Sequence, residues 1–368
     1  MLVYIVIFAV SVYLFHNATT LESPKQRLFL IVLAILPMAF IAGVRDDCIG
    51  TDVIVYGRDV FLDAVAGTNY ADFDLEWMIR MEPGYLMLNF IVSRFTEDYH
   101  VFFGLLMTMQ LFFVMYALLH FKDKFPVWVA LMAYYLLYYN VSLNQMRQNL
   151  ACAIVLYSFI FVVKKNFFPF LLFIGLASLF HISAVVAIVL YPVYHYVVKK
   201  KSIILVVTLL SAGVLVALLV QNFVDMVLSF VGLNDKYAHY FKDSTHGFFI
   251  MRFLIMLPIP VIFCYFWDYA KEKGDEVYFI IFSLCVSIIA TQARELIGND
   301  AERIISYFSL FQIFAIPWLI DALEESVKKK IVLALSIGYY GTYWYYMFIY
   351  NDFHETYPYS SYILNQWI

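Results

Sequence analysis

The chain has 368 residues, of which 64% are apolar and only 14% are charged, and its mean hydropathy is +0.79. Soluble domains carry roughly 25% charged residues, so this composition excludes an ordinary soluble protein and indicates an integral membrane protein. The net charge of −4 is uninformative by itself, and no nucleic-acid partner is expected. The four cysteines are scattered without a CxxC pair or a histidine cluster, so no disulfide framework, metal site or cofactor is expected either.

The hydropathy pattern predicts an all-α polytopic membrane protein. Crossing the hydrocarbon core takes ~20 apolar residues, or fewer where neighbouring helices bury the run. The first run lacks a basic n-region and a cleavage site, so we expect a retained span rather than a signal peptide. We place twelve spans near residues 1–16, 27–44, 100–120, 125–140, 146–163, 167–180, 182–198, 202–220, 248–267, 277–293, 303–320 and 331–350.

The lysines predict the orientation of these spans. Thirteen of the fifteen lysines fall in alternate loops, which the positive-inside rule makes cytoplasmic. The short apolar stretch 83–96 carries Arg94 and is predicted to be a re-entrant or interfacial helix, because a full crossing there would reverse every later loop. Both termini are then external. We expect one multi-span domain over 1–368, with external loops 45–99, 221–247 and 294–302.

The arginines follow the opposite distribution, because only Arg27 of the nine is cytoplasmic in this topology. The guanidinium fork binds carboxylates and phosphates bidentately and stays charged when partly desolvated. A cluster at the external face therefore indicates an anionic ligand such as a lipid-linked pyrophosphate. The alternative is that these arginines pair with external acids. The external set is Arg45, Arg58, Arg80, Arg94, Arg147, Arg252, Arg294 and Arg303.

Arg147 borders the clearest polar pattern, at the start of an otherwise apolar helix. Asn140, Asn144, Gln148 and Ala151 recur at three- and four-residue spacing and form one polar, small-residue stripe. A charged residue at such a position is a functional hypothesis by default.

Other candidates lie at the external ends of predicted helices. His181 is either a satisfied polar contact or a general base. Arg294 and Arg303 lie at facing ends of consecutive helices and could point at one cavity, with Glu295 and Glu302 as their structural partners.

Two further external features carry alternative interpretations. Asp72-Phe73-Asp74 looks like the metal-binding pair of nucleotide-sugar enzymes, but nucleotide sugars are absent outside the cell, so we discount it. Tyrosine and tryptophan crowd the external helix ends, for example in 134–139 and 339–350. An aromatic belt explains them by default, whereas their scarcity at the cytoplasmic ends favours a surface on which sugar rings stack.

Five short motifs, taken in chain order, resemble the EpsG family of Wzy-type polymerases, which build bacterial exopolysaccharide, capsule and O-antigen. They are Arg45 with Gly50-Thr51-Asp52 and Tyr56, then Glu82-Pro83-Gly84-Tyr85, then Arg147-Gln148 with Ala151, then His181-Ile182-Ser183-Ala184, and finally Arg303 with Tyr307. The stretch after residue 200 matches less clearly, which leaves Arg252 and Arg294 open.

The resemblance implies a glycosyltransferase of the GT-C type in the bacterial inner membrane, active at the periplasmic face. It would transfer a growing glycan from undecaprenyl pyrophosphate to a new lipid-linked repeat unit, and a chain-length regulator would be a possible partner. Arginines can stabilise the leaving pyrophosphate without a metal, and the acceptor hydroxyl needs a base. We expect Arg147 and Arg303 on the pyrophosphate with Arg45 assisting, further glycan or pyrophosphate contacts from Gln148, Arg252, Arg294 and Tyr307, and a base among His181, Asp52 and Glu82.

Two other classes of protein share these features. A flippase or transporter of lipid-linked saccharide would also carry external arginines and aromatics, but such transporters often show repeat-like halves, and no repeat is visible here. An O-antigen ligase-like glycosyltransferase would move glycan to a different acceptor and leave chain length unchanged. The sugars, the linkage and the stereochemical outcome are not encoded in any motif of the chain.

Overall fold

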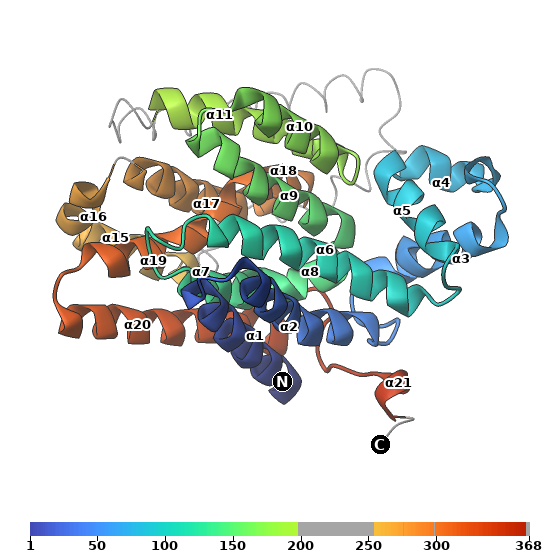
Figure 1. The fold of residues 1–368 in the computed structure, drawn as a ribbon, viewed down its shortest axis with the longest axis horizontal. Coiled ribbons are helices and arrows are strands. Elements are labelled where there is room, and N and C mark those ends of the chain that lie inside the picture. The colour runs from blue at the N-terminus through green and yellow to red at the C-terminus, as the bar shows by residue number, and fades with distance from the viewer. Residues whose placement is uncertain (198–253, 275, 298, 366–368) are drawn as a thin grey trace. The chain divides into compact units, whose positions relative to one another are not determined.

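The computed structural model describes residues 1–197, 254–274, 276–297 and 299–365, and all regular structure in these ranges is helical (Figure 1). The chain forms two compact units, and the single multi-span domain over 1–368 stays a prediction. The first consists of residues 1–185 together with 331–368, and the second of residues 186–330. The predicted external loop 221–247 and span 202–220 lie outside the described residues.

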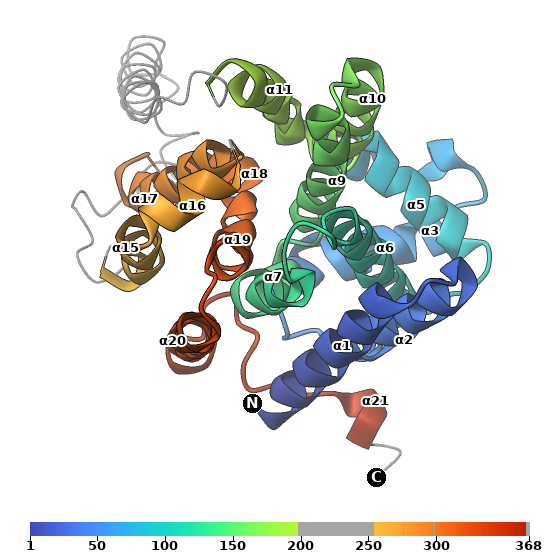
Figure 2. The same ribbon diagram turned by 60° about the vertical axis from the view of Figure 1, so that its left-hand side comes forward.

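The first unit contains the predicted amino-terminal spans and the long external segment that follows them. Here α2 packs against α1 and α6, and α9 lies between α6 and α10 (Figure 2). Its helices are α1 (Leu2–Thr20), α2 (Pro24–Gly43), η1 (Val53–Gly57), α3 (Arg58–Ala66), η2 (Tyr70–Asp72), α4 (Leu75–Arg80), α5 (Pro83–Ser93), α6 (Tyr99–Leu119), α7 (Val127–Tyr134), η3 (Tyr135–Tyr139), α8 (Asn140–Asn144), α9 (Met146–Val163), α10 (Phe167–Ser178), η4 (Ile182–Val189), α20 (Ser326–Trp344), η8 (Tyr345–Tyr350) and α21 (Tyr362–Asn365).

The second unit is built around α17, which packs against α18 and η7. The Trp318 indole donates to the Ala270 carbonyl (3.2 Å), and Lys273 pairs with Asp321, so α19 is tied to α16. Residues 294–297 and 299–302, expected in an external loop, are helical. The helices are α11 (Leu190–Pro192), η5 (Val193–Val197), α15 (Pro258–Tyr265), α16 (Trp267–Lys273), α17 (Val277–Ile297), α18 (Asn299–Ser309), η7 (Leu310–Phe314) and α19 (Ala315–Ala322).

The protein is a multi-pass membrane protein. Five helical stretches of the described chain are long and apolar enough to cross a bilayer, namely 2–20, 24–43, 99–119, 146–163 and 303–322. A sixth arises if 254–265 and 267–273, bent by 70°, form one broken span. The count of twelve is not confirmed, because the predicted span 202–220 and the start of 248–267 lie outside the described residues. Other predicted runs fall on shorter helices or are interrupted by π-helical or 3₁₀ segments, as at 135–139 and 182–189.

The stretch predicted to be re-entrant or interfacial is the short helix α5. At 1.5 Å per residue, its 11 residues span about 16 Å, roughly half of a hydrocarbon core. Its re-entrant or interfacial placement stays a prediction.

Many of the aromatic residues expected at a sugar-binding surface form the core of the first unit instead. Tyr135, Tyr139 and Trp344 are buried and pack around Phe8, with ring centroids 5.3–6.0 Å apart. The Tyr135 and Tyr139 hydroxyls bond Ser11 (2.6 Å) and the Met38 carbonyl (2.8 Å). Buried rings with satisfied hydroxyls stabilise helix packing. The stacking-surface interpretation is therefore wrong for these residues.

After η8 the chain reverses and runs back over the amino-terminal helices as an irregular segment, the C-terminal strap (residues 351–361). The Asp46 amide donates to the Ser360 carbonyl (3.1 Å), and the Tyr359 hydroxyl donates to the Ile41 carbonyl (3.0 Å). The Tyr4 hydroxyl donates to the Thr356 carbonyl (2.7 Å). These contacts join residues more than 300 positions apart in the sequence.

The strap's docking predicts an engineered cross-link. The Cys48 Sγ atom lies 3.6 Å from the Ser360 Oγ atom. With the other three cysteines replaced by alanine, Ser360→Cys should form a disulfide with Cys48 on mild oxidation, detected as a linked peptide by mass spectrometry. Ser361→Cys is the matched control, because the Ser361 side chain is buried and donates to the Val44 carbonyl. Equal linkage in both variants would contradict the docked strap.

Candidate functional site

The site is centred on a helix break. The helix α8 ends at Asn144, Gln145 adopts a non-helical ψ of 59°, and α9 begins at Met146. Arg147 therefore lies in the first turn of an 18-residue helix that has no side-chain cap. Helix amino termini carry unsatisfied N–H groups and a partial positive charge. The sequence thus places a guanidinium and the positive end of a helix at one point.

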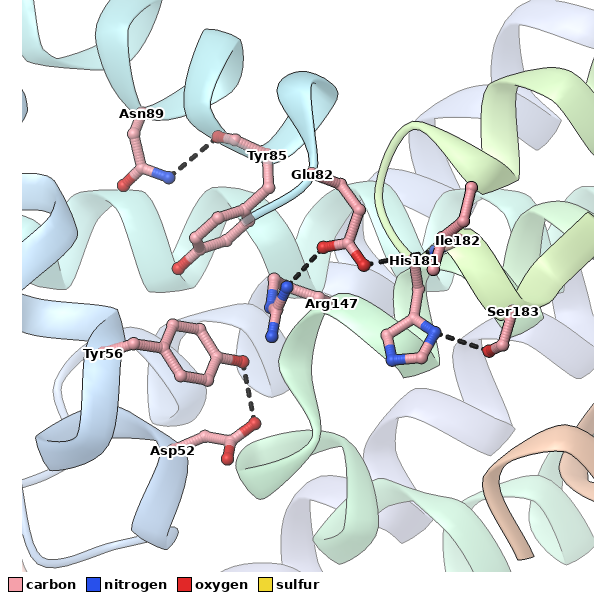
Figure 3. Close-up of polar contacts among 9 residues, drawn as sticks. All are labelled: Asp52, Tyr56, Glu82, Tyr85, Asn89, Arg147, His181, Ile182 and Ser183. Atoms are coloured by element: carbon pink, nitrogen blue, oxygen red, sulfur yellow. Dashed lines mark hydrogen bonds and ion pairs between the residues drawn. The ribbon is translucent and has the colours of Figure 1, made fainter. Parts of the chain in front are cut away.

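Arg147 is held by Glu82, the residue that precedes α5. Arg147 Nη1 donates to Glu82 Oε2, and the two side chains are only 16% and 14% exposed. The other carboxylate oxygen, Oε1, accepts from the Ile182 amide (3.1 Å; Figure 3). Because both oxygens of Glu82 are engaged, this one carboxylate ties together the starts of α5, α9 and η4.

Two tyrosine rings flank the Arg147 guanidinium. Its central carbon lies 4.6 Å from the ring centroid of Tyr56 and 5.7 Å from that of Tyr85. Cation–π contacts of this length favour the charged arginine inside an apolar environment. The compensation is incomplete, because Arg147 Nε and the Tyr85 hydroxyl are buried and make no hydrogen bond of normal geometry within the described chain. Buried polar atoms without partners are costly, so this niche suits polar atoms of a ligand.

Asp52 supplies a second carboxylate beside this cation. The Tyr56 hydroxyl donates to Asp52 Oδ2 (2.7 Å), and the Asp52 amide donates to Asn144 Oδ1 (2.9 Å; Figure 3 draws the first contact). Burial and then the Asp52 carboxylate raise the pKa of Tyr56 well above its usual range. Tyr56 therefore remains a neutral hydroxyl that donates to Asp52 throughout the physiological range.

His181 lies in the corner between α10 and η4, next to the amide that binds Glu82. Its Nδ1 atom is 2.6 Å from the Ser183 hydroxyl, which fixes the ring orientation (Figure 3). Either partner can be the donor, so this contact alone does not assign the histidine tautomer.

Two glycines permit the close backbone approaches that assemble the site. The Gly84 amide donates to the Leu179 carbonyl (2.9 Å), and a Cβ atom at Gly84 would lie only 2.6 Å from that oxygen. Gly50 adopts a φ of 87°, and a Cβ there would lie 2.6 Å from the Leu143 carbonyl oxygen, beside the helix break. Any larger residue at either position must displace backbone.

Arg45, expected to assist at the pyrophosphate, is 2% exposed and bound by backbone oxygens. It donates to the carbonyls of Ala42, Ile49 (3.2 Å) and Leu143 (3.0 Å) and lies over the Phe103 ring. This geometry favours a positioning role, because Arg45 fastens the loop around Ile49, which is predicted to be external, to Leu143 near the end of α8. Its assistance at a ligand remains a prediction.

Of the other arginines of the first unit that are predicted to be external, Arg58 and Arg80 pair with acids, as in the structural alternative, and Arg94 binds a backbone carbonyl instead. Arg58 pairs with Asp47 (2.9 Å) and Asp59 (3.1 Å), and Arg80 pairs with Glu76 (2.5 Å). Arg94 donates to the Ala64 carbonyl and stacks on Phe90. The two aspartates of the 72–74 motif stabilise turns. Asp72 accepts from the Thr68 and Asn69 amides (both 2.8 Å), and Asp74 caps α4.

The structure brings Asp52, Glu82, Arg147 and His181 into the first unit, with Gln148 buried on α9. The remaining predicted site residues stay predictions. Arg303 is exposed and Tyr307 buried, and both belong to the second unit; Arg252 and the Arg294 side chain lie outside the described residues.

Two residues of the polar network carry no site role in the sequence analysis. The sequence pattern marks Asn144 only as part of a polar stripe. In the structure its side chain bridges Asp52 and His354, whose Nδ1 atom lies 2.9 Å from Asn144 Nδ2. His354 is one of eight histidines, and no local motif marks it. The chain reversal that places it is not readable from hydropathy.

The fold defines a multi-pass helical membrane protein, and its candidate site combines a half-buried arginine with two carboxylates and a histidine. A model of the EpsG family matches residues 28–361, nearly the whole chain, so the protein belongs to the EpsG family. No curated protein and no solved structure matches it. EpsG is a Wzy-type polymerase-like family, and membership supports a role like that of a polysaccharide repeat-unit polymerase.

The close approach at Gly84 yields a stability prediction. Gly84→Ala should lower the melting temperature of the detergent-solubilised protein, because backbone overpacking costs about 1–3 kcal/mol. Gly175→Ala is the matched control, because a Cβ atom there has no other heavy atom within 4 Å. It should leave stability unchanged or raised, since alanine is favoured over glycine within helices by roughly 0.5–1 kcal/mol. Equal destabilisation by both changes would show that the Gly84 contact is unimportant.

Proposed function

We propose that this protein polymerises lipid-linked oligosaccharide repeat units at the periplasmic face of the bacterial inner membrane. The growing glycan moves from undecaprenyl pyrophosphate to an acceptor hydroxyl of a new repeat unit, and Arg147 stabilises the leaving pyrophosphate. The observation that carries the proposal is the incomplete compensation of the half-buried Arg147 guanidinium.

The arrangement around Arg147 suits a leaving group whose negative charge grows during the reaction. Glu82 and the two tyrosine rings hold the guanidinium in place before the ligand arrives, while its Nε atom makes no hydrogen bond to the described chain. A preorganised donor stabilises developing charge without reorganisation. The first turn of α9 adds N–H groups of the same polarity.

Asp52 is the base that this geometry favours. Both oxygens of Glu82 are engaged by Arg147 and Ile182, which makes Glu82 a positioning residue. The Asp52 carboxylate accepts from the Tyr56 hydroxyl, and the Tyr56 ring flanks Arg147, so this carboxylate belongs to the same cluster as the cation. His181, oriented by Ser183, is the second candidate.

The reaction balances without an added metal or co-reactant. The bond between the anomeric carbon and the pyrophosphate oxygen breaks, and its electron pair leaves with the pyrophosphate beside Arg147. The acceptor oxygen forms the new glycosidic bond and gives its proton to Asp52. The lipid tails remain in the bilayer, and a chain-length regulator is a possible partner.

The fork geometry of Arg147 gives the first test of this function. Purified protein is mixed with undecaprenyl-pyrophosphate-linked repeat units, and a ladder at repeat-unit spacing is expected on a gel. Arg147→Lys keeps the charge but loses bidentate binding, so polymerisation should slow by at least about tenfold.

Arg58→Lys is the matched control for this test, because Arg58 is also an external, ion-paired arginine of the first unit. Its exposed pair contributes little, so the rate should stay within about twofold of the wild type. A wild-type rate in Arg147→Lys would refute the proposed pyrophosphate contact. If folded wild-type protein formed no ladder, a liposome flipping assay would test transport instead.

If Asp52 is the base, substitutions at Asp52 and at His181 should lower the transfer rate by different amounts. Asp52→Asn removes the proton acceptor but keeps the hydrogen-bonding shape, and should slow single-turnover transfer by about 10²-fold or more. His181→Gln should cost less than about tenfold if the ring only packs and positions. The reverse order of losses would assign the base to His181. Circular dichroism and melting temperature serve as controls for folding in both variants.

A further inference from the structure

The C-terminal strap reaches the helix break of the candidate site. The Gly50 amide donates to the Glu355 carbonyl (2.9 Å), and the Thr51 hydroxyl donates to Glu355 Oε2 (2.9 Å). Asn140 Nδ2 donates to Thr356 Oγ1 (2.8 Å). The strap thus contacts residues 50 and 51 and the helix α8, which ends at the break, and the His354 ring contacts Asn144 at the end of α8.

The backbone around His354 is held in an unusual conformation. Of the four non-glycine residues with positive φ in the described ranges, three are in the strap: Asp352 (47°), His354 (76°) and Glu355 (54°). The backbone of a non-glycine residue rarely adopts a positive φ, and such conformations persist only where the surrounding structure enforces them. Here the surroundings are the contacts of Glu355 and Thr356, which place the His354 ring against Asn144.

The hydrogen-bond directions around Asn144 can be deduced. The Asp52 backbone N–H can only donate, so the Asn144 atom facing it at 2.9 Å must be Oδ1. The amide nitrogen Nδ2 then faces His354 Nδ1 at 2.9 Å and donates to it. His354 Nδ1 is therefore the acceptor, and the proton of the neutral ring is on Nε2.

We propose that His354 is a positioning residue of the site and acts through Asn144 to hold Asp52. The order of contacts is His354 Nδ1, the Asn144 amide, the Asp52 backbone and then the Asp52 carboxylate beside Tyr56. Its effect on transfer rests on the proposed function, in which Asp52 is the base. The hydrogen-bond relay itself does not depend on that function.

Two substitutions at 354 separate the acceptor atom from the backbone. His354→Asn keeps an acceptor near the Nδ1 position, and asparagine tolerates positive φ, so polymerisation should stay within about threefold of the wild type. His354→Gly accommodates the backbone but has no acceptor, so the rate should fall about tenfold, as for one lost hydrogen bond. Asp352→Gly, also at a positive φ, adds backbone freedom to the strap and removes the hydrogen bond from the Tyr357 amide to Asp352 Oδ1 (3.0 Å), so it gives an upper limit for the loss that a loosened strap causes.

The outcomes discriminate between roles. A wild-type rate in His354→Gly overturns the proposal. Equal losses in His354→Gly and His354→Asn would show that the imidazole itself is needed, which also overturns a role through Asn144. Rescue by asparagine but not by glycine supports it, because a purely structural strap would tolerate glycine at least as well.

A spectroscopic measurement decides the relay even if no polymer forms. In protein with ¹⁵N-labelled histidine, the signals absent from His354→Asn identify His354. They should show a neutral ring with the proton on Nε2 and a hydrogen-bonded Nδ1. The Nδ1 signal should shift in Asn144→Ala but not in Asn149→Ala, whose side chain donates to the Gln145 carbonyl (3.0 Å).

A proton on Nδ1, or an Nδ1 signal insensitive to Asn144→Ala, would overturn the relay whatever the activity. Conversely, absence of polymer from folded wild-type protein with the expected spectrum would refute the proposed function and leave the relay intact.

Discussion

The ion pair between Arg147 and Glu82 is the constraint on which the site depends. Both side chains are largely withdrawn from water, at 16% and 14% exposure, so each charge needs the other. Removing one partner would leave an uncompensated charge in an apolar environment. The pair therefore fixes where the short helix α5 begins relative to α9, and the Ile182 amide on Glu82 adds the start of η4. Glycine at 84 allows the start of α5 to approach the Leu179 carbonyl at the end of α10.

The same pair leaves one arginine donor for the ligand that we propose. Glu82 uses both oxygens, whereas the guanidinium has five donors, of which the buried Nε–H finds no partner in the described part of the chain. The rings of Tyr56 and Tyr85 offset part of the desolvation without neutralising the charge. Glu82 and the two rings thus stabilise the charged guanidinium within the fold, and its Nε–H remains without a hydrogen-bond partner in the described chain.

The sequence predicted the helical class and a short helix near 83–96, and it named Asp52, Glu82, Arg147 and His181 as candidates, because these depend on hydropathy and on short motifs. The sequence did not predict the features that depend on contacts between distant parts of the chain. Tyr135, Tyr139 and Trp344 occur in an external aromatic pattern but pack into a core. The loop expected at 294–302 is largely helical. His354 reaches Asn144, 210 residues away in sequence, through backbone conformations that no local preference would select.

The arginines that are predicted to lie at the external face indicate an anionic ligand. The structure shows how the surroundings of these arginines differ. Arg45 is fully buried but bound by carbonyl oxygens, Arg58 lies between two aspartates, and Arg147 is half-buried with one carboxylate. The three residues have the same chemistry and differ only in how completely their surroundings satisfy them. Residue type and membrane side are therefore insufficient to locate a ligand. What singles out Arg147 is a partly desolvated cation whose partners leave a buried donor without a hydrogen bond.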